Sequence, residues 1–460
     1  MSRSTAGLAG SVREVPRGSL RYWALGCLYL FAFIPPQSIA LGQLSQLAML
    51  IVAVIIGFRH RHLMSGSVLL WIGVAYVLYV LGRGVIAAFL EQPELTIAHL
   101  DGTSSWARTI VLPTIIFGLV LLATGNWARH ATGAIVALVL GVLAFEVLPA
   151  WSWNELTAAL QGSSRYIFGM GHSRSGFLIG AALILALGFA PALVSGLSNN
   201  GSATRSGAKY LRFFLWVMII TVLLIALFAT KTRTAWFAVL PATFVVVLAA
   251  AWIYRDRLFK PQALIGMLAL VMLVAGVIVA GWGELERRLT SAGEGMQQTL
   301  QMQSLADAWE LEDRNVGARV AYKVFAIQLW VDRPLAGWGP AEPYYLMDKR
   351  PIPPLLEGRS GHFHDAHVEI LARLGLTGWL LIMAFVACLM FEAFRMIAGN
   401  GRNKALSSML ALTGIGFAVL MLVWMLGTHQ ITRFQSSHVI AVFLGPICAS
   451  HFQRLVQASE

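Results

Sequence analysis

The sequence has little charge, few cysteines and fewer acidic than basic residues. Only 12% of its 460 residues are charged, whereas 57% are apolar. A water-facing surface normally carries about twice this charged fraction, which excludes a soluble enzyme and a disordered protein. The three cysteines, Cys27, Cys388 and Cys448, all fall inside apolar runs. Neither a disulfide framework nor a cysteine-based metal site is therefore indicated.

Long apolar runs dominate the chain instead. The first follows a polar, arginine-bearing stretch without a small-residue cleavage site, so we expect it to be retained as a helix. A bilayer-spanning helix uses roughly 20 residues, so a dozen would fill about half of the chain. The predicted fold class is an all-α polytopic membrane protein with about 12 transmembrane helices. The runs lie near residues 22–40, 43–58, 67–90, 107–125, 131–150, 173–195, 211–229, 235–253, 261–282, 365–391, 408–427 and 435–452.

The positions of the basic residues predict the orientation of these helices. The chain has 34 Lys and Arg against 22 Asp and Glu. Such an excess could indicate a nucleic-acid partner, but in a membrane protein it usually marks cytoplasmic connections. Seventeen of the 34 fall in the N-terminal tail and in alternate connections along the chain. We therefore expect no nucleic-acid partner, and both termini in the cytoplasm.

One connection is much longer than the others. Residues 283–363 hold nine basic and eleven acidic residues, so this connection lacks the cytoplasmic signature and is assigned to the external, periplasmic side. Its residues 303–331 have helical apolar spacing, which predicts a helix along the membrane surface. The predicted organisation is nine transmembrane helices with short loops in 1–282, a large periplasmic loop containing helices in 283–363, and three transmembrane helices with a cytoplasmic C-terminus in 364–460.

Charged side chains near membrane depth are costly, and those on the external side are functional candidates. The strongest stand in the short connection Lys231-Thr232-Arg233-Thr234-Ala235-Trp236. One interpretation is that Lys231 and Arg233 extend to lipid phosphates. The other is anion capture, because a guanidinium offers phosphate a planar fork of donors and Arg233 precedes a helix N-terminus. We favour anion capture, and Arg233 over Lys231.

Three histidines, His362, His364 and His367, stand where the long connection enters its next membrane helix. Zinc binding would need further ligands, and neither a cysteine nor an HExxH motif accompanies them. Ordinary interfacial histidines are a second alternative. We favour general-base chemistry, because a neutral imidazole takes a proton at physiological pH. Asp365 or Glu369 would orient the imidazole.

Further cations are expected on the same external side. Arg319 and Lys323 share one face of the predicted loop helix, either as a site or as a solvated face. Arg165 and Arg174 flank the turn Gly169-Met170-Gly171-His172 and would contact an anionic headgroup. Arg83, near the outer end of its apolar run, either does the same or extends to lipid phosphates.

Three segments together resemble the O-antigen ligase and polymerase superfamily. The segment 230–236 is similar to the family's Ser-Arg-x-Ala-Trp segment. The run from Arg319 to Gly339 resembles an Arg-led helix followed by a Pro-x-x-Gly-x-Gly turn. The run from His364 to Gly378 resembles the block His-Asn-x-x-Leu-x-x-Leu-x-x-x-Gly-Leu-x-Gly, with Asp365 in place of Asn. The order of the segments around one large external loop makes the combination specific.

The resemblance implies a glycosyltransferase of lipopolysaccharide biosynthesis in the bacterial inner membrane. Its donor would be O-antigen on undecaprenyl diphosphate, its acceptor lipid A-core, and its active site periplasmic among membrane lipids. His364 takes the place of the family histidine, as general base, and Arg233 and Arg319 take the places of the two arginines that hold the pyrophosphate. Arg165 and Arg174, which no family motif assigns, would add to the pyrophosphate contacts. A supporting role falls to four neighbours: Asp365, His362, His367 and Lys323.

The expected reaction needs no cofactor and no metal. Many soluble glycosyltransferases hold a divalent metal on an Asp-x-Asp pair, and this sequence has none. No external carboxylate stands out as a nucleophile, which favours a single displacement with inversion. An O-antigen polymerase and a protein O-oligosaccharyltransferase of the same superfamily are the nearest alternatives. A secondary transporter is an alternative of another class, disfavoured because transporters place their sites near the midplane.

Overall fold

A computed structural model describes residues 19–34, 38–162, 164–197, 206–255, 314–349, 362–399, 404–428 and 430–458, with single residues between 256 and 313. Within these ranges the regular structure is entirely helical. The helices are α1 (Ser19–Phe33), α2 (Ile39–Arg59), α3 (Arg61–Met64), α4 (Val68–Ile86), η1 (Ala87–Glu91), η2 (Pro93–Leu95), α5 (Thr96–Ala107), α6 (Val111–Ala123), α7 (Trp127–Val142), η3 (Leu143–Val147), α8 (Trp153–Gln161), α9 (His172–Leu197), α10 (Ser206–Ala229), α11 (Arg233–Ile253), α15 (Arg314–Asp332), η6 (Pro343–Lys349), α16 (Ala366–Ala398), α17 (Lys404–Met425), η8 (Gln430–Thr432) and α18 (Phe434–Ala458).

The described residues contain ten helical segments that are long and apolar enough to cross a membrane. They contain α2, α4, α5 with α6, α7, α9, α10, α11, α16, α17 and α18. This confirms the predicted all-α polytopic membrane fold. The first predicted span corresponds to α1, which has only 15 residues and packs against α2 and α7. The predicted span 261–282 lies outside the described residues, apart from single positions.

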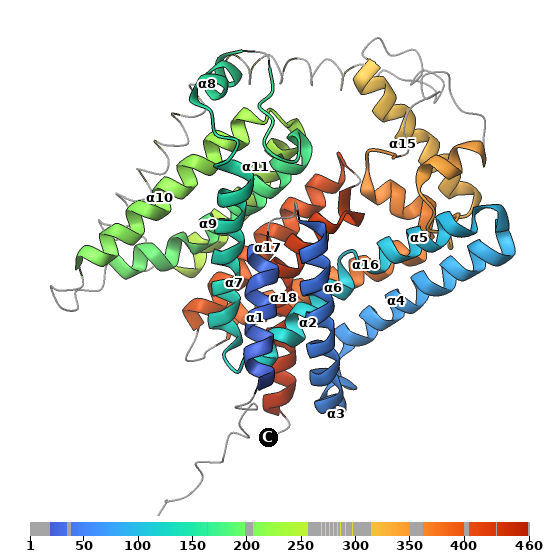
Figure 1. Cartoon of the computed structure of the whole chain (residues 1–460), viewed down its shortest axis with the longest axis horizontal. Coiled ribbons are helices and arrows are strands. Elements are labelled where there is room, and N and C mark those ends of the chain that lie inside the picture. The colour runs from blue at the N-terminus through green and yellow to red at the C-terminus, as the bar shows by residue number, and fades with distance from the viewer. Residues whose placement is uncertain are drawn as a thin grey trace, which may run out of the picture.

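The helices form a central group with a wing on either side (Figure 1). In the centre, α6 packs along α18 and α2, and α1 packs along α7. Helices α9, α10 and α11 form one wing, and α4, α5, α15 and α16 form the other. Helix α17 contacts α9 and α11 as well as α16, so it joins the two wings. The C-terminal end of α18 lies at the bottom of Figure 1, whereas α8 and α15 lie at the top.

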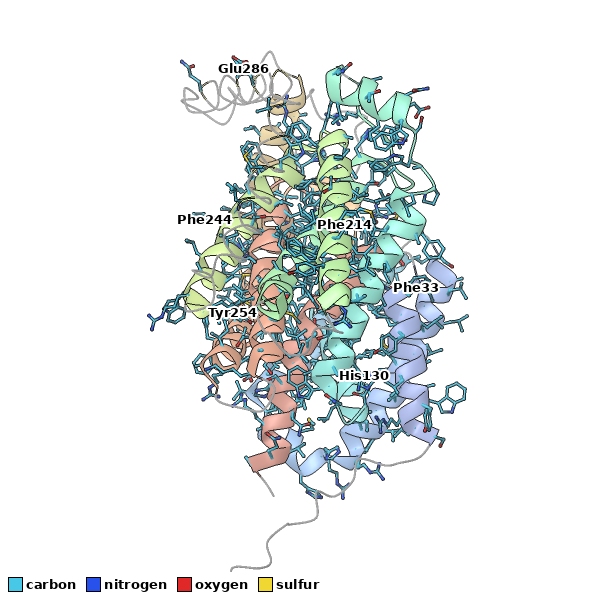
Figure 2. All side chains as sticks on the ribbon, turned by 90° about the vertical axis from the view of Figure 1, so that its left-hand side faces the viewer. Phe33, His130, Phe214, Phe244, Tyr254 and Glu286 are labelled. Atoms are coloured by element: carbon cyan, nitrogen blue, oxygen red, sulfur yellow. The ribbon has the colours of Figure 1, made fainter. Side chains whose placement is uncertain are left out.

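Large apolar side chains cover the outside of this bundle. Phe214 on α10 and Phe244 on α11 are each 64% exposed and extend outward (Figure 2). An apolar surface of this extent is unfavourable in water and is normal against lipid acyl chains. Inside the bundle, small residues allow close helix packing. Gly118 of α6 lies against Cys448 of α18, and a Cβ added there would lie 2.9 Å from the sulfur.

Two helices differ from their predicted boundaries. The span predicted at 107–125 begins earlier, because Pro93 starts a helical run that continues through α5 and α6. Helix α16 is two helices in succession, since Gly375 interrupts it with φ +67°. The loop helix predicted at 303–331 corresponds to α15, and its residues 303–313 lie outside the described part. Its position along a membrane surface and the division of the chain at 283 and 363 stay predictions.

Candidate active site

The candidate site is at the beginning of α16, which Asp365 caps. One oxygen of the Asp365 carboxylate accepts hydrogen bonds from the backbone N–H groups of His367 at 3.0 Å and Val368 at 3.2 Å. Its other oxygen lies 2.9 Å from Lys323 Nζ. Carboxylates favour this position because the first N–H groups of a helix lack partners within the helix. Asp365 therefore fixes the helix start and holds Lys323, and no hydrogen bond joins it to His364 among the described contacts.

The imidazole of His364 is packed among aromatic rings and cations. His364 has a left-handed backbone, with φ +55°, in the turn before the helix. Its ring centre lies 3.9 Å from that of His362 and 5.6 Å from that of Tyr322. Burial lowers the pKa of His364 to about 3, with further lowering from His362, Arg319 and Lys323. The imidazole is therefore neutral at physiological pH, and the lowered pKa makes it a weaker base than an exposed histidine.

Arg319 and Lys323 both reach this histidine pair from α15. The positive charge of Arg319 contributes to lowering the pKa of both His362 and His364, below the main effect of burial. Lys323 donates a hydrogen bond of 2.8 Å to the carbonyl of Leu426, in addition to its ion pair with Asp365. Their spacing of four residues places both on one helix face, as predicted. Residues about 40 positions apart in the sequence thus form one cluster, which we call the His364 cluster: Arg319, Lys323, His362, His364 and Asp365.

The glycine-rich turn 334–339 docks on the break in α16. Gly337, with φ +66°, lies so close to the chain that an added Cβ would be 2.5 Å from the Arg373 carbonyl. A Cβ on Gly375 would likewise clash with the carbonyl of Leu335. Both positions therefore require glycine, because the backbones of the two segments lie too close together for a side chain. Four backbone hydrogen bonds of 2.8–3.2 Å join the segments: Trp338 N to Ala372 O, Gly339 N to Arg373 O, Leu376 N to Pro334 O and Thr377 N to Leu335 O.

Arg83 holds this turn from α4. It is buried and donates hydrogen bonds of 2.9 Å to the Ala336 carbonyl and 2.8 Å to the Gly337 carbonyl. The carboxylate of Glu91 lies 2.7 Å from Arg83 Nη2 and balances its charge. Gln92 adds a hydrogen bond of 3.0 Å to the Trp338 carbonyl. Both sequence-based interpretations of Arg83, as a headgroup ligand and as a lipid-facing arginine, are therefore wrong, because its guanidinium is occupied inside the protein.

Arg233 begins α11 beside the segment that carries Arg165 and Arg174. Thr232 Oγ1 donates a hydrogen bond of 2.9 Å to the His172 carbonyl. The backbone N–H of Tyr166 donates one of 3.0 Å to the Ala229 carbonyl. These bonds tie the residues around 165–174 to the start of α11. The three arginines therefore belong to one region, which we call the Arg233 region: Arg165, Arg174 and Arg233.

Lys231 has a structural place in the same connection. Its side chain is fully buried, and its Nζ donates a hydrogen bond to the Gly162 carbonyl. The alternative in which Lys231 extends to lipid phosphates is therefore wrong. This supports the choice of Arg233, which is only partly buried, as the cation of this connection that a ligand can reach.

The end of α17 lies between the Arg233 region and the His364 cluster. The Leu426 carbonyl accepts the hydrogen bond from Lys323. The next residue, Gly427, contacts the start of α11: a Cβ added to it would lie 2.6 Å from Cγ2 of Thr234, the residue that follows Arg233. The predicted residues thus gather at one end of the bundle, the end with α15 in Figure 1. His367 is turned to the bundle, with Nε2 3.3 Å from the Leu422 carbonyl and Nδ1 3.4 Å from Trp379 Nε1.

A polar pocket beside His362 contains Asp101, Glu342, Arg373 and Arg433, none of which was predicted as a site residue. Its space is about 750 Å³, part of it open to solvent. Glu369, predicted as a group that orients the imidazole, instead forms a buried ion pair of 2.6 Å with Arg373 at the pocket wall. Two features of the sequence point to Arg373 and Arg433: a Glu–Arg pair four residues apart in an apolar helix, and an arginine in the short connection before α18. The pocket is lined by Asp101, Gly102, Ser105, Glu342, Pro343, His362, Glu369, Arg373, Thr432 and Arg433.

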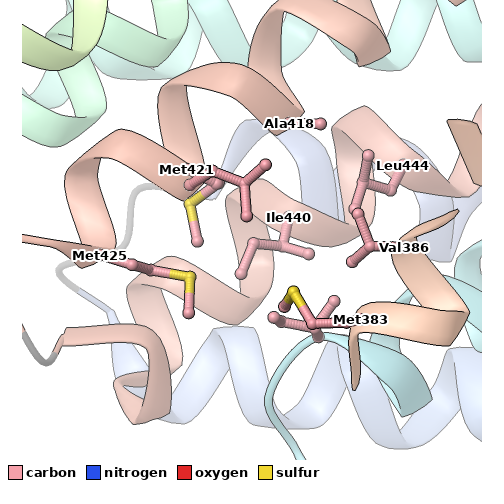
Figure 3. Close-up of a pocket in the computed structure, with 9 residues that line it drawn as sticks. Met383, Val386, Ala418, Met421, Met425, Ile440 and Leu444 are labelled. Atoms are coloured by element: carbon pink, nitrogen blue, oxygen red, sulfur yellow. The ribbon is translucent and has the colours of Figure 1, made fainter. Parts of the chain in front are cut away.

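A second cavity is apolar. It has about 330 Å³ of space among α16, α17 and α18 and is lined by side chains such as Met383, Met421 and Met425 (Figure 3). Methionines fill irregular apolar space, but none of the lining side chains can transfer a proton. This cavity therefore does not carry the acid–base chemistry. Among the described residues, no group of three or more His, Cys, Asp or Glu side chains is placed to hold a metal ion. Metal independence stays a prediction.

The fold and the site define a polytopic membrane protein with an imidazole and several cations gathered at one end of its helices. The family model described as O-antigen ligase matches residues 217–383, which contain Arg233, Arg319 and His364. This match confirms the resemblance seen in the sequence and supports the O-antigen ligase superfamily, a group of glycosyltransferase-like membrane enzymes, for the part of the chain that it covers. No curated protein matches the chain.

Proposed function

We propose that this protein is an O-antigen ligase, which transfers a glycan from undecaprenyl diphosphate to lipid A-core. The proposal places the reaction on the periplasmic side of the inner membrane, with both termini in the cytoplasm. The observation that carries it is the His364 cluster: a neutral imidazole beside Arg319 and Lys323. A base and a set of cations are the two requirements of glycan transfer from a diphosphate carrier.

The imidazole serves the acceptor. His364 takes the proton from the acceptor hydroxyl while the oxygen attacks the anomeric carbon of the glycan. The bond between that carbon and the diphosphate breaks, and its electron pair leaves with the diphosphate. One new C–O bond replaces one broken C–O bond, so a single displacement with inversion needs no redox partner. The neutral form of His364, favoured by its surroundings, is the form that this step uses.

The cations serve the leaving group. Arg319 lies on the His364 side of the α17 end, and Arg233, with Arg165 and Arg174 nearby, lies on the other. Guanidinium groups bind phosphate oxygens through paired donors and stabilise the charge that develops on them. In this proposal the diphosphate spans the α17 end between the two groups. Lys323 has a positioning role, because its ion pair and its hydrogen bond to Leu426 join α15, α16 and α17.

A transfer assay with purified components tests the function. The protein is reconstituted in vesicles with undecaprenyl-diphosphate-linked glycan, and lipid A-core is added with or without EDTA. We expect glycan-bearing lipid A-core and free undecaprenyl diphosphate in equal amounts, unaffected by EDTA. A longer glycan on the carrier without lipid A-core would indicate a polymerase. Glycan on an added acceptor protein would indicate an oligosaccharyltransferase. Movement of substrate without a new bond would indicate a transporter.

A further inference from the structure

We propose that the polar pocket beside His362 is the subsite for the acceptor saccharide, and that it takes a neutral, hydroxyl-rich sugar. This inference rests on the proposed function, because it presumes that the acceptor is a glycan. No motif of the sequence analysis predicts this pocket. Its walls come from the α5 residues Asp101 and Ser105, from Glu342 and Pro343, from α16, and from the η8 end with Arg433.

The balance of charge in the pocket disfavours a diphosphate. Glu369 and Arg373 neutralise each other across 2.6 Å. The remaining lining holds two carboxylates, on Asp101 and Glu342, against one cation, Arg433. The net charge of the lining is therefore −1, because burial lowers the pKa of His362 and keeps it neutral. An anionic carrier would be repelled here, whereas sugar hydroxyls can donate to the carboxylates and accept from Arg433.

The wall of the pocket also contains unused hydrogen-bonding groups. Glu369 is 1% exposed and Arg373 is 3% exposed. Within the described part of the chain, Glu369 Oε2 and Arg373 Nε have no hydrogen-bond partner. Buried polar atoms are normally paired, so an acceptor and a donor left at a cavity wall point to partners from outside the chain. A sugar hydroxyl is both donor and acceptor, and it can pair with either atom after a small turn of the side chain, because both atoms are buried just beneath the pocket surface.

The position of the pocket assigns it to the acceptor and not to the glycan of the donor. His362 lines the pocket and its ring packs on His364 with centres 3.9 Å apart. Lys323, joined to Asp365 and Leu426, contributes to the surroundings of His364 and is not part of the pocket lining. In a single displacement the acceptor oxygen and the leaving diphosphate stand on opposite sides of the reacting carbon. Neither Arg319 nor Lys323 is among the pocket lining, so a sugar in the pocket would bring its hydroxyl to the histidine pair from a wall that these two cations do not form.

The test uses two substitutions of exposed lining residues, Asp101→Asn and Glu342→Gln, in the full chain reconstituted in vesicles. We expect each to raise the KM for lipid A-core about tenfold, because each replaces a charged carboxylate, which binds sugar hydroxyls strongly, with a neutral amide. The KM for the lipid-linked donor should stay within about twofold. Glu155→Gln on α8, an exposed residue outside the pocket, is the matched control and should change neither constant.

Direct binding gives an independent readout. Core oligosaccharide freed of lipid A is titrated into donor-free protein, and the Kd should rise about tenfold in the same two variants. An unchanged Kd and acceptor KM in both variants would overturn this inference while leaving the proposed function intact. A rise of the donor KM alone would also overturn it, by assigning the pocket to the donor glycan. If the wild-type protein makes no product from lipid A-core, the proposed function fails and the inference falls with it.

Discussion

The two ends of the helix bundle treat charge differently. Near the C-terminus, the Glu392 carboxylate is buried and nearly saturated by donors from α18: Ser450 Oγ at 3.2 Å and Arg454 Nε at 2.8 Å, with His451 Nδ1 at 3.6 Å. At the other end, the charges of Arg319 and Lys323 lower the pKa of His364, and the His364 cluster contains one carboxylate, that of Asp365. The first arrangement is a closed ion pair that joins two helices. The second leaves an excess of positive charge beside a neutral imidazole, which is what the proposed diphosphate donor requires.

The contrast also separates two kinds of arginine. Arg83 and Arg373 are buried, each beside a carboxylate; Arg83 bonds two carbonyls of the turn 334–339, and Arg373 bonds the carbonyl of Pro340 directly after it. Arg319 is exposed, and Arg233 is partly buried. A fully buried charge with partners inside the fold contributes to architecture, whereas one with exposed surface can reach a ligand. Residue type and membrane depth alone do not distinguish the two kinds.

The largest expected effect is that of His364→Ala. Loss of the proposed base should reduce glycan transfer about 10²- to 10⁴-fold with an unchanged melting temperature. The measurement is initial rate in the vesicle assay, with melting of the same sample. His130→Ala is the control, because His130 pairs with Tyr29 at 3.0 Å in the central group and should leave the rate unchanged. Transfer by His364→Ala at a tenth of the wild-type rate or more would remove the base assignment.

The next effect concerns architecture. Gly375→Ala should destabilise the protein by about 1–3 kcal/mol, because an alanine is strained at φ +67° and its Cβ would meet the Leu335 carbonyl. Thermal melting in detergent measures it. Gly82→Ala is the matched control, since no atom lies within 4 Å of an added Cβ there. Equal melting temperatures for the two variants would contradict the docking of the turn on α16.

A smaller effect is expected when accessible arginines keep their charge but lose the guanidinium fork. Arg233→Lys and Arg319→Lys should each raise the donor KM about tenfold, because lysine binds phosphate as a point charge. Arg129→Lys, at an exposed position on α7, serves as control. An unchanged donor KM in either variant would contradict diphosphate binding by that arginine and would favour a contact with lipid.

The smallest effect on activity is expected at the closed end. Glu392→Gln should lower the melting temperature, because it removes the charge that Arg454 faces, and should keep transfer within about twofold of wild type. A tenfold loss of transfer at an unchanged melting temperature would show that this end takes part in function and would abolish the contrast between the two ends.

The sequence predicts the helices and the convergence of the motif residues, but not the partners of buried charges. Apolar runs and charge counts suffice for the spans, because each span is a local property. Lys231 could not be placed, since its partner, the Gly162 carbonyl, is 69 residues away in the sequence. The break at Gly375 depends on a turn formed some 40 residues earlier.

The polar pocket is missing from the sequence-based account for a related reason. Its lining comes from α5, the residues around Glu342, α16 and the start of α18. Three of these segments belong to none of the recognised motifs. The sequence shows Glu369 and Arg373 as two charges four residues apart in an apolar helix. It does not show that they line a pocket, because the other walls come from distant segments of the chain. A composite surface of this kind follows from packing and not from any local pattern.

The most direct test of the central claim, that Arg319 and His364 share one electrostatic site, is the pH dependence of kcat/KM. The base acts in its neutral form, so activity is lost as the pH falls through its pKa. With the pKa of His364 lowered to about 3, wild-type kcat/KM should show no loss from this group down to about pH 5. Removing the Arg319 charge lets that pKa rise, so Arg319→Gln should show its acid limb at higher pH than wild type. An acid limb near the ordinary histidine value of 6.5, identical in wild type and Arg319→Gln, would contradict the account.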